Sequence, residues 1–180
     1  ASLIVFSGMW YARTLVESNT TSGYISTNPA SARVTLEPAV MPEKTDEFIA
    51  AAKAEPGVID ATMRQVTNVK LQEESGGLKS LQLFVAEAAD PMRIATFDIE
   101  QGAGWPPPPD GILIERSTLA SLKLKVGDKV DVIGFDGKPR QLTVMGSVHD
   151  QSLALAGQTA GVGYIQSDTL PFLGKPPAFD

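Results

Sequence analysis

The sequence contains no cysteine and a single histidine, His149. Disulfides, thiol catalysis and cysteine metal sites are therefore excluded together. Carboxylates are then the main remaining metal ligands, and no calcium-loop spacing of the D-x-D-x-D-G type is present. We predict neither a metal site nor a cofactor. Avoiding free thiols fits an extracytoplasmic protein, although many cytosolic domains also lack cysteine.

An excess of basic residues is missing as well. The chain has 15 Lys and Arg against 21 Asp and Glu, a formal net charge of −6. The basic residues are scattered singly, whereas nucleic-acid binding requires a basic patch or stripe. We therefore expect no nucleic-acid partner. With 43% hydrophobic and 20% charged residues in 180, the composition is that of one folded domain or two small ones.

No apolar run reaches the about 20 residues that span a bilayer. Residues 3–12 are nevertheless almost all apolar, and they end in Trp10 and Tyr11, shortly before Arg13. This pattern fits the outer end of a membrane helix, a buried core helix or a signal segment, although a signal peptide would begin with basic residues. The polar continuation at 13–23 fits a stalk.

The first half of the chain predicts a strand, a helix and two further strands, with a turn at 74–77. Alternation and helix-stop signals at Pro56 and Gly57 give the strand at 32–37, the helix at 43–54, a β-rich stretch at 58–71 and a strand at 78–86. This order is typical of half of a split β-α-β sandwich, a small sheet with helices on one side.

Residues 90–110 have the composition of a linker and include four prolines at 106–109. The stretch 111–151 predicts a compact β-module with one helical turn. It contains an apolar strand at 112–114, a helix capped by Ser117, a strand at 129–132 and an Asp136-Gly137 hairpin, followed by a strand whose Leu142, Val144 and Val148 face inward. We expect an exposed loop at 151–163, a strand at 164–165 and a last short helix from Asp168 to Leu173.

Candidate catalytic groups are few. His149 and Asp150 formally permit a Ser-His-Asp hydrolase, but no G-x-S-x-G elbow exposes a nucleophile. A glycosidase carboxylate pair stays open, because its members would be distant in the sequence. The glycines at 102–104 are followed by prolines and do not form a phosphate loop. The Trp105-Pro segment fits either a rigid connector or a ligand for an aromatic groove. We therefore assign no catalytic residue.

Several stretches, taken in order, resemble the large extracytoplasmic domain of FtsX-like ABC transporter permeases, the group that includes MacB. They are YISTNPASA at 24–32, PGV at 56–58, GWP at 104–106, ILIERS at 112–117, LKVGDKV at 124–130, the hairpin at 136–137, VMGSVHD at 144–150, YI at 164–165, DTL at 168–170 and LG at 173–174. Each piece is weak alone, since L-K-V-G-D-x-V occurs in many small β-barrels. The ordered set covers nearly the whole chain.

The resemblance implies an α+β fold in which a porter-like βαβ-type subdomain is interrupted by a small β-rich insertion. The porter-like part would be 30–100 with 161–180, the insertion 101–160, and residues 1–29 a membrane-proximal stalk helix. The resemblance also implies a non-enzymatic domain that couples ATP-driven motion of membrane helices to export or to a partner. It would lie on the extracytoplasmic side of the cell (inner) membrane, anchored by helices outside this segment.

The implied partners are a cytoplasmic ATPase, a second copy of the permease and a periplasmic or envelope protein. Family domains continue beyond the point that corresponds to Asp180, so further strands of the sheet are expected there. Two rival readings stay open: a secreted hydrolase that uses His149 with a carboxylate, and a free-standing ligand-binding module with an apolar pocket.

Overall fold

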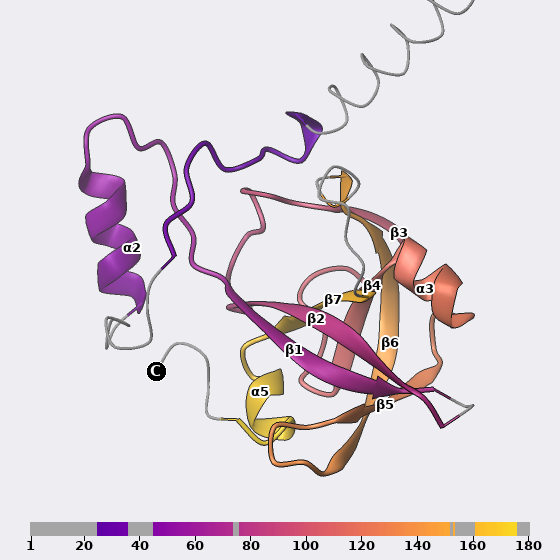
Figure 1. The fold of residues 1–180 in the computed structure, drawn as a ribbon. Coiled ribbons are helices and arrows are strands. Elements are labelled where there is room, and N and C mark those ends of the chain that lie inside the picture. Colours follow the sequence, from indigo (N-terminus) through magenta and orange to yellow (C-terminus); the bar gives the residue numbers. More distant parts are fainter. Residues whose placement is uncertain (1–24, 36–44, 74–75, 152, 154–160, 176–180) are drawn as a thin grey trace, which may run out of the picture.

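The computed structural model describes residues 25–35, 45–73, 76–151, 153 and 161–175 (Figure 1). Residues 1–24 of the predicted N-terminal stalk helix at 1–29, and most of the predicted loop at 151–163, lie outside these residues. The described elements are α2 (Thr45–Ala54), β1 (Gln65–Gln72), β2 (Leu78–Ala86), β3 (Asp98–Gly102), β4 (Gly111–Glu115), α3 (Arg116–Leu122), β5 (Lys129–Ile133), β6 (Pro139–His149), β7 (Gly161–Gln166) and α5 (Thr169–Phe172).

Six of the strands close into a ring. Their order is β6-β4-β7-β2-β1-β5, and β5 pairs back onto β6. The β2–β7 and β4–β6 pairs are parallel and the others antiparallel. β3 is attached to β6 outside the ring. The mixed sheet and its few helices confirm the prediction of an α+β fold at this coarse level. The porter-like architecture stays a prediction.

The interior of the ring is filled by alternate residues from all six strands, as period-two strands require. Leu81, Leu83 and Val85 on β2 are at most 1% exposed. Leu170 and Leu173, at α5, are fully buried in the same cluster, and Leu119 and Leu122 of α3 pack against it. Its buried members are Val69, Leu71, Leu81, Leu83, Val85, Ile112, Ile114, Val130, Val132, Leu142, Val144, Ile165, Leu170 and Leu173.

A second apolar cluster covers the outer face of the sheet at β4 and β7. Leu113 and Tyr164 belong to it, together with Met92 and Phe97 from the segment between β2 and β3. The Tyr164 ring lies 5.4 Å from Phe84 and 4.6 Å from Phe97, between centroids. β4 is therefore buried on both faces, which explains why its sequence is a continuous apolar run and does not alternate.

The prediction of a linker over the whole of 90–110 is wrong. β3 lies inside this stretch, and Met92 and Phe97 are each only 8% exposed. The proline run is also attached, since the side-chain amide of Gln166 donates to the Pro107 carbonyl oxygen at 2.8 Å. Composition is misleading here because buried anchors, among them Met92, Phe97 and Pro107, hold a segment whose residues are otherwise mostly exposed.

Two predicted strands differ from the structure. The described part of 32–37, residues 32–35, contains no strand, and the β-rich stretch 58–71 becomes a strand only at Gln65. Neighbouring β-branched residues are not enough without a partner strand: Ile59 is 99% exposed. The approach to β1 is instead fixed by Arg64, whose guanidinium donates to the carbonyl oxygens of Ala95 and Ile94, at 2.8 and 2.5 Å.

The helix predicted at 43–54 is confirmed over its described part as α2. It does not cover the sheet as predicted: Figure 1 shows it standing apart from the strands, and its described side chains are exposed or half-exposed. Its apolar face consists of only Phe48, Ile49 and Ala52 in ten residues. The short helices α3 and α5 cover the ring instead.

The predicted boundary between a porter-like part and an insertion at 101–160 stays a prediction. The described strands of the two segments share hydrogen bonds, through the pairs β4–β7 and β1–β5. Gly146 marks the place where the pairing changes. The registers of β4 and β3 on β6 both shift near it, and a Cβ there would collide with the Ala103 carbonyl oxygen. A close approach of this kind requires glycine.

Candidate functional site: a polar network where three strands end

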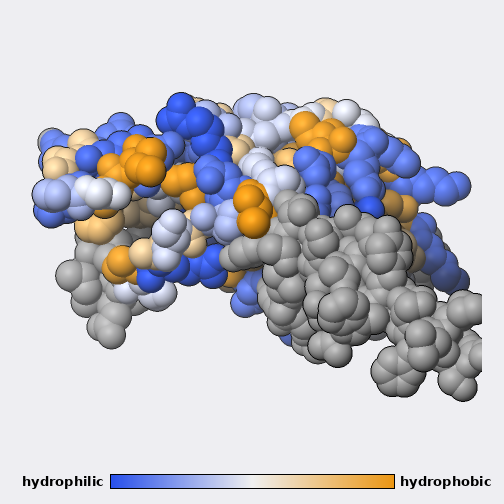
Figure 2. Space-filling view, turned by 90° about the horizontal axis from the view of Figure 1, so that it is seen from above, coloured by the Kyte–Doolittle hydropathy of each residue, from blue (hydrophilic) through white to orange (hydrophobic). Residues whose placement is uncertain are grey.

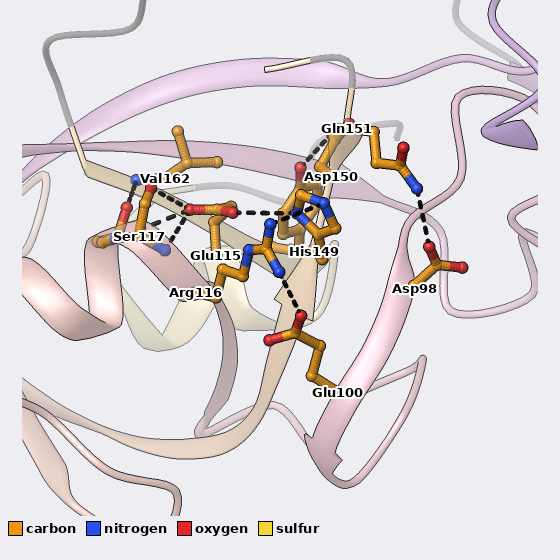
Figure 3. A network of polar contacts seen from close by, with 11 residues as sticks. Asp98, Glu100, Glu115, Arg116, Ser117, His149, Asp150, Gln151 and Val162 are labelled. Carbon is orange, nitrogen blue, oxygen red and sulfur yellow. Dashed lines mark hydrogen bonds and ion pairs between the residues drawn. The ribbon is translucent and has the colours of Figure 1, made fainter. Parts of the chain in front are cut away.

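The polar side chains of the second half gather at one edge of the sheet (Figure 3). β4 ends at Glu115, α3 begins at the next residue, and Glu115 pairs in parallel with Val148 of β6. Arg116 and His149, the residues that follow each of these, therefore lie side by side. β3 completes the site, because Asp98 pairs with His149 across the β3–β6 ladder.

Glu115 is a buried carboxylate, 5% exposed, that caps α3. Its Oε2 accepts hydrogen bonds from the backbone N–H groups of Ser117 and Thr118, at 2.6 and 3.4 Å, and from the Ser117 hydroxyl. The sequence prediction that Ser117 caps the helix is therefore wrong by two positions. The strand leads into the helix without a linker, so the last strand residue takes the capping role.

His149 is half-buried and contacts two charged neighbours. Its Nε2 lies 3.0 Å from Nη2 of Arg116, and its Nδ1 lies 3.7 Å from Oε1 of Glu115. The other guanidinium nitrogen, Nη1, donates to Glu100 Oε1 on β3 at 2.8 Å. One arginine thus joins the start of α3 to both the end of β6 and the edge strand.

The neighbouring Asp150 is tied to the second apolar cluster. It is 7% exposed, and its Oδ2 accepts a hydrogen bond of 2.5 Å from the Tyr164 hydroxyl. Burial, and then the charge of Asp150, raises the pKa of the Tyr164 hydroxyl well above its usual range. On the exposed side, the Gln151 amide donates to Asp98 at 3.3 Å. The V-H-D end of β6 is thus held on both faces of the sheet.

The geometry does not form a hydrolase triad. In such a triad the imidazole lies between the nucleophile and the carboxylate and takes the proton of the hydroxyl. Here the carboxylate of Glu115 lies between Ser117 and His149, and the Ser117 hydroxyl donates to Glu115. The imidazole nitrogens face an arginine and a carboxylate. These contacts hold together the start of α3 and the ends of β4 and β6.

The network was only partly foreseeable. The sequence singled out His149 and Asp150, but gave no sign of Glu115, Arg116 and Glu100 as partners, because the contacts depend on strand pairing.

Among the residues that the structure describes, no three His, Asp or Glu side chains form a group that could hold a metal ion. Within the same residues, no helix has the length and apolar character needed to cross a membrane.

The exposed apolar side chains do not form one patch on the face that Figure 2 shows. There the orange groups are separated by blue and white ones. The large exposed apolar residues are Ile25, Val34, Phe48, Val58, Ile59, Val66, Leu78, Ile99, Phe135 and Phe172. Single exposed apolar residues are normal on a protein surface, and on this face they form no continuous apolar patch.

Raising the pH above about 10, the ordinary pKa of tyrosine, is expected to destabilise the protein through Tyr164. The pKa of its hydroxyl is raised in the folded state, so folding keeps a proton that the unfolded chain releases. The contribution of this hydroxyl to the free energy of unfolding is fully present below pH ~10. It is lost as the pH rises toward the folded-state pKa. Melting temperatures at about pH 9 and about pH 11 measure the loss. It should be smaller in Tyr164→Phe than in the wild type, and an equal loss in both would contradict the assignment.

No protein-family model and no curated protein matches the sequence. Solved structures similar to it include the following two. One is the periplasmic region of MacB from Actinobacillus actinomycetemcomitans, with 16% identity, a TM-score of 0.45, and coverage of 71% of this chain and 56% of that one. The other is the extracellular domain of the noncanonic ABC-type transporter YknZ from Gram-positive bacteria, with 17% identity, a TM-score of 0.49, and coverage of 81% and 71%. The chain spans little more than half of the MacB region.

Proposed function

We propose that this chain is a non-catalytic extracytoplasmic domain of an ABC-type permease of the FtsX-like group. The observation that carries the proposal is the ordered set of motifs, several of which form elements of the closed ring. ILIERS at 112–117 forms β4 and the start of α3, and VMGSVHD at 144–150 forms the end of β6. A motif set that forms consecutive structural parts is stronger support than the same letters scattered over loops.

Four further motifs also coincide with elements or turns of the fold. LKVGDKV at 124–130 forms the turn into β5, with Gly127 at a φ of 94°, and the Asp136-Gly137 pair forms the β5–β6 turn, with Gly137 at 77°. YI at 164–165 lies in β7, and Gly174 ends α5 at a φ of 82°. Positive φ is the conformation that favours glycine, so the glycines of these motifs are the residues that this backbone requires.

In this role the domain works mechanically. ATP-driven motion of membrane helices outside this segment would reach it through the stalk at 1–29 and change how it contacts its partners. The proposed partners are the cytoplasmic ATPase, a second copy of the permease and an envelope protein. The closed ring, two apolar clusters and the polar network at the ends of β4 and β6 suit a rigid body that transmits motion, because packed interiors transmit strain.

The location is tested by labelling a single introduced cysteine in intact cells. Lys138 lies exposed at the end of the β5–β6 turn, and this segment has no cysteine of its own. Full-length Lys138→Cys is expected to react with a membrane-impermeant maleimide before lysis. The wild-type full-length protein is the control for background labelling. Reaction of the variant only after lysis would place the domain in the cytoplasm and end the proposal.

The transporter assignment needs a second measurement. The full-length gene is expected to encode apolar stretches of about 20 residues or more that flank this segment. A cytoplasmic ATPase is expected to co-purify with the full-length protein from membranes. If the domain is outside the cell but no ATPase is associated with it, the location stands and the ABC-type role is wrong.

A further inference from the structure

The histidine at the end of β6 joins three elements through one guanidinium. Arg116 donates to His149 Nε2, so this nitrogen must carry a lone pair and the proton of the neutral ring must be on Nδ1. Nδ1 is the nitrogen that faces Glu115 at 3.7 Å, and it has no hydrogen-bond partner. The contact seen in Figure 3 is therefore the contact of a neutral imidazole.

We propose that His149 is a pH-dependent latch: neutral, it fixes Arg116 and through it Glu100 of β3, and protonated, it releases Arg116, so that Glu100 is tied to a side chain that is no longer held in place. Protonation puts a hydrogen on Nε2, which can then no longer accept from Arg116. It also places two cations at the observed separation of 3.0 Å. The latch therefore opens when the imidazole takes up this second proton.

Carboxylates on neighbouring elements determine which partner the protonated imidazole contacts. Glu115 of β4 faces Nδ1, Asp98 of β3 is the cross-strand neighbour, and Asp150 follows in the chain and binds Tyr164 of β7. Of these contacts, only the one with Glu115 becomes stronger on protonation of His149 without any movement of the side chains. Protonation therefore exchanges one partner for another: the imidazolium keeps Glu115 and loses Arg116, while Arg116 keeps only Glu100.

β3 is the element that depends on this contact. It has five exposed residues and pairs with β6 alone. Its register shifts between Ile99 and Gln101, and the residue between them, Glu100, has no Cα partner in that ladder. The ion pair with Arg116 fixes the irregular position. An exposed, bulged edge strand is the kind of element that opens locally at low free-energy cost.

The size of the effect is modest. The side chains of Arg116 and Glu100 are 50% and 36% exposed, and water screens such contacts. We expect the opening of β3 to become about two- to fivefold more frequent on protonation, the range of an exposed charged contact. The inference does not depend on the proposed function, since it follows from the geometry of this chain alone.

The test uses imidazole and amide NMR on the 180-residue chain. Because His149 is the only histidine, its ring nitrogens give one unambiguous pair of signals. Across a pH titration they should show the proton on Nδ1 while the ring is neutral, and on both nitrogens once the ring is protonated. Over the same range the β3 amides, corrected for intrinsic exchange, should exchange about two- to fivefold faster. A neutral ring with its proton on Nε2 would overturn the proposal.

Two variants separate the latch from general acid effects. His149→Gln keeps an acceptor for Arg116 and does not titrate, so its β3 amides should show no pH response after correction. Glu100→Gln weakens the link to β3, so the imidazole should still titrate while the β3 response shrinks. If β3 in His149→Gln responds to acid as in the wild type, the latch does not exist. If that variant fails to fold, the ring tautomer and Glu100→Gln still decide.

Discussion

Replacing Leu83 by alanine is expected to lower the free energy of unfolding by about 3–5 kcal/mol. Leu83 is fully buried on β2 at the interior of the ring, opposite Thr67 of β1 and Gly163 of β7. Truncation removes apolar contacts, and the cavity cannot collapse easily, because the surrounding side chains come from strands that hydrogen bonds hold in a closed ring. Urea unfolding followed by circular dichroism measures the change.

The same strand offers a matched control. Leu78 begins β2 and is 60% exposed, so Leu78→Ala makes the same chemical change where little is buried. Its expected effect is about 0.5 kcal/mol or less. If the two variants lost similar stability, the ring interior would not be the main core of the protein, and the closed topology would be in doubt.

The parts that the sequence predicts best are strands with one face in the core. The strand predicted at 78–86 is β2, residue for residue, and its predicted inward side chains Leu81, Leu83 and Val85 are all buried. The return strand of the hairpin behaves similarly at Leu142 and Val144, which are buried in the ring interior. Val148, predicted to face the same way, is instead buried in the second cluster, beyond the register shift near Gly146. Alternation survives here because a local turn at 136–137 fixes the register and the core fixes the face.

The parts that it misses depend on pairing between distant segments. β3 lies in a stretch with the composition of a linker, and it becomes a strand only because the edge of β6 is available to it. Closure of the ring likewise rests on a short β1–β5 contact, Lys70 with Ile133 and Leu71 with Val132. No local pattern encodes these pairings, since strand preference depends on what the neighbouring strand supplies.

The candidate site shows the same division. His149 attracted interest as the only histidine, but its meaning depends on Arg116 and Glu115, which are adjacent in sequence and more than thirty residues away from it. Only the parallel register of β4 on β6 brings them together. The sequence could therefore identify an unusual residue, but it could not distinguish a catalytic histidine from one that joins secondary-structure elements.

Removing the Glu115 carboxylate is expected to be nearly as damaging as a core truncation, with Glu115→Ala losing about 2–4 kcal/mol of unfolding free energy. The carboxylate is buried and accepts from two backbone N–H groups of α3, and alanine would leave both without their acceptor, one of them at Thr118, which is only 5% exposed. It also faces His149, so its loss weakens the whole network. The effect is large because Glu115 is both the last residue of β4 and the N-cap of α3.

Asp128 supplies the control, because it makes a similar contact in water. Its Oδ2 accepts from the Lys125 backbone N–H at 2.8 Å, in an exposed turn. In Asp128→Ala solvent replaces the lost acceptor, so the expected loss is about 0.5–1 kcal/mol. Thermal or urea unfolding of both variants measures the difference. Equal losses would mean that burial adds nothing to the Glu115 cap, and the network would then be a surface feature that holds neither α3 nor the end of β6 in place.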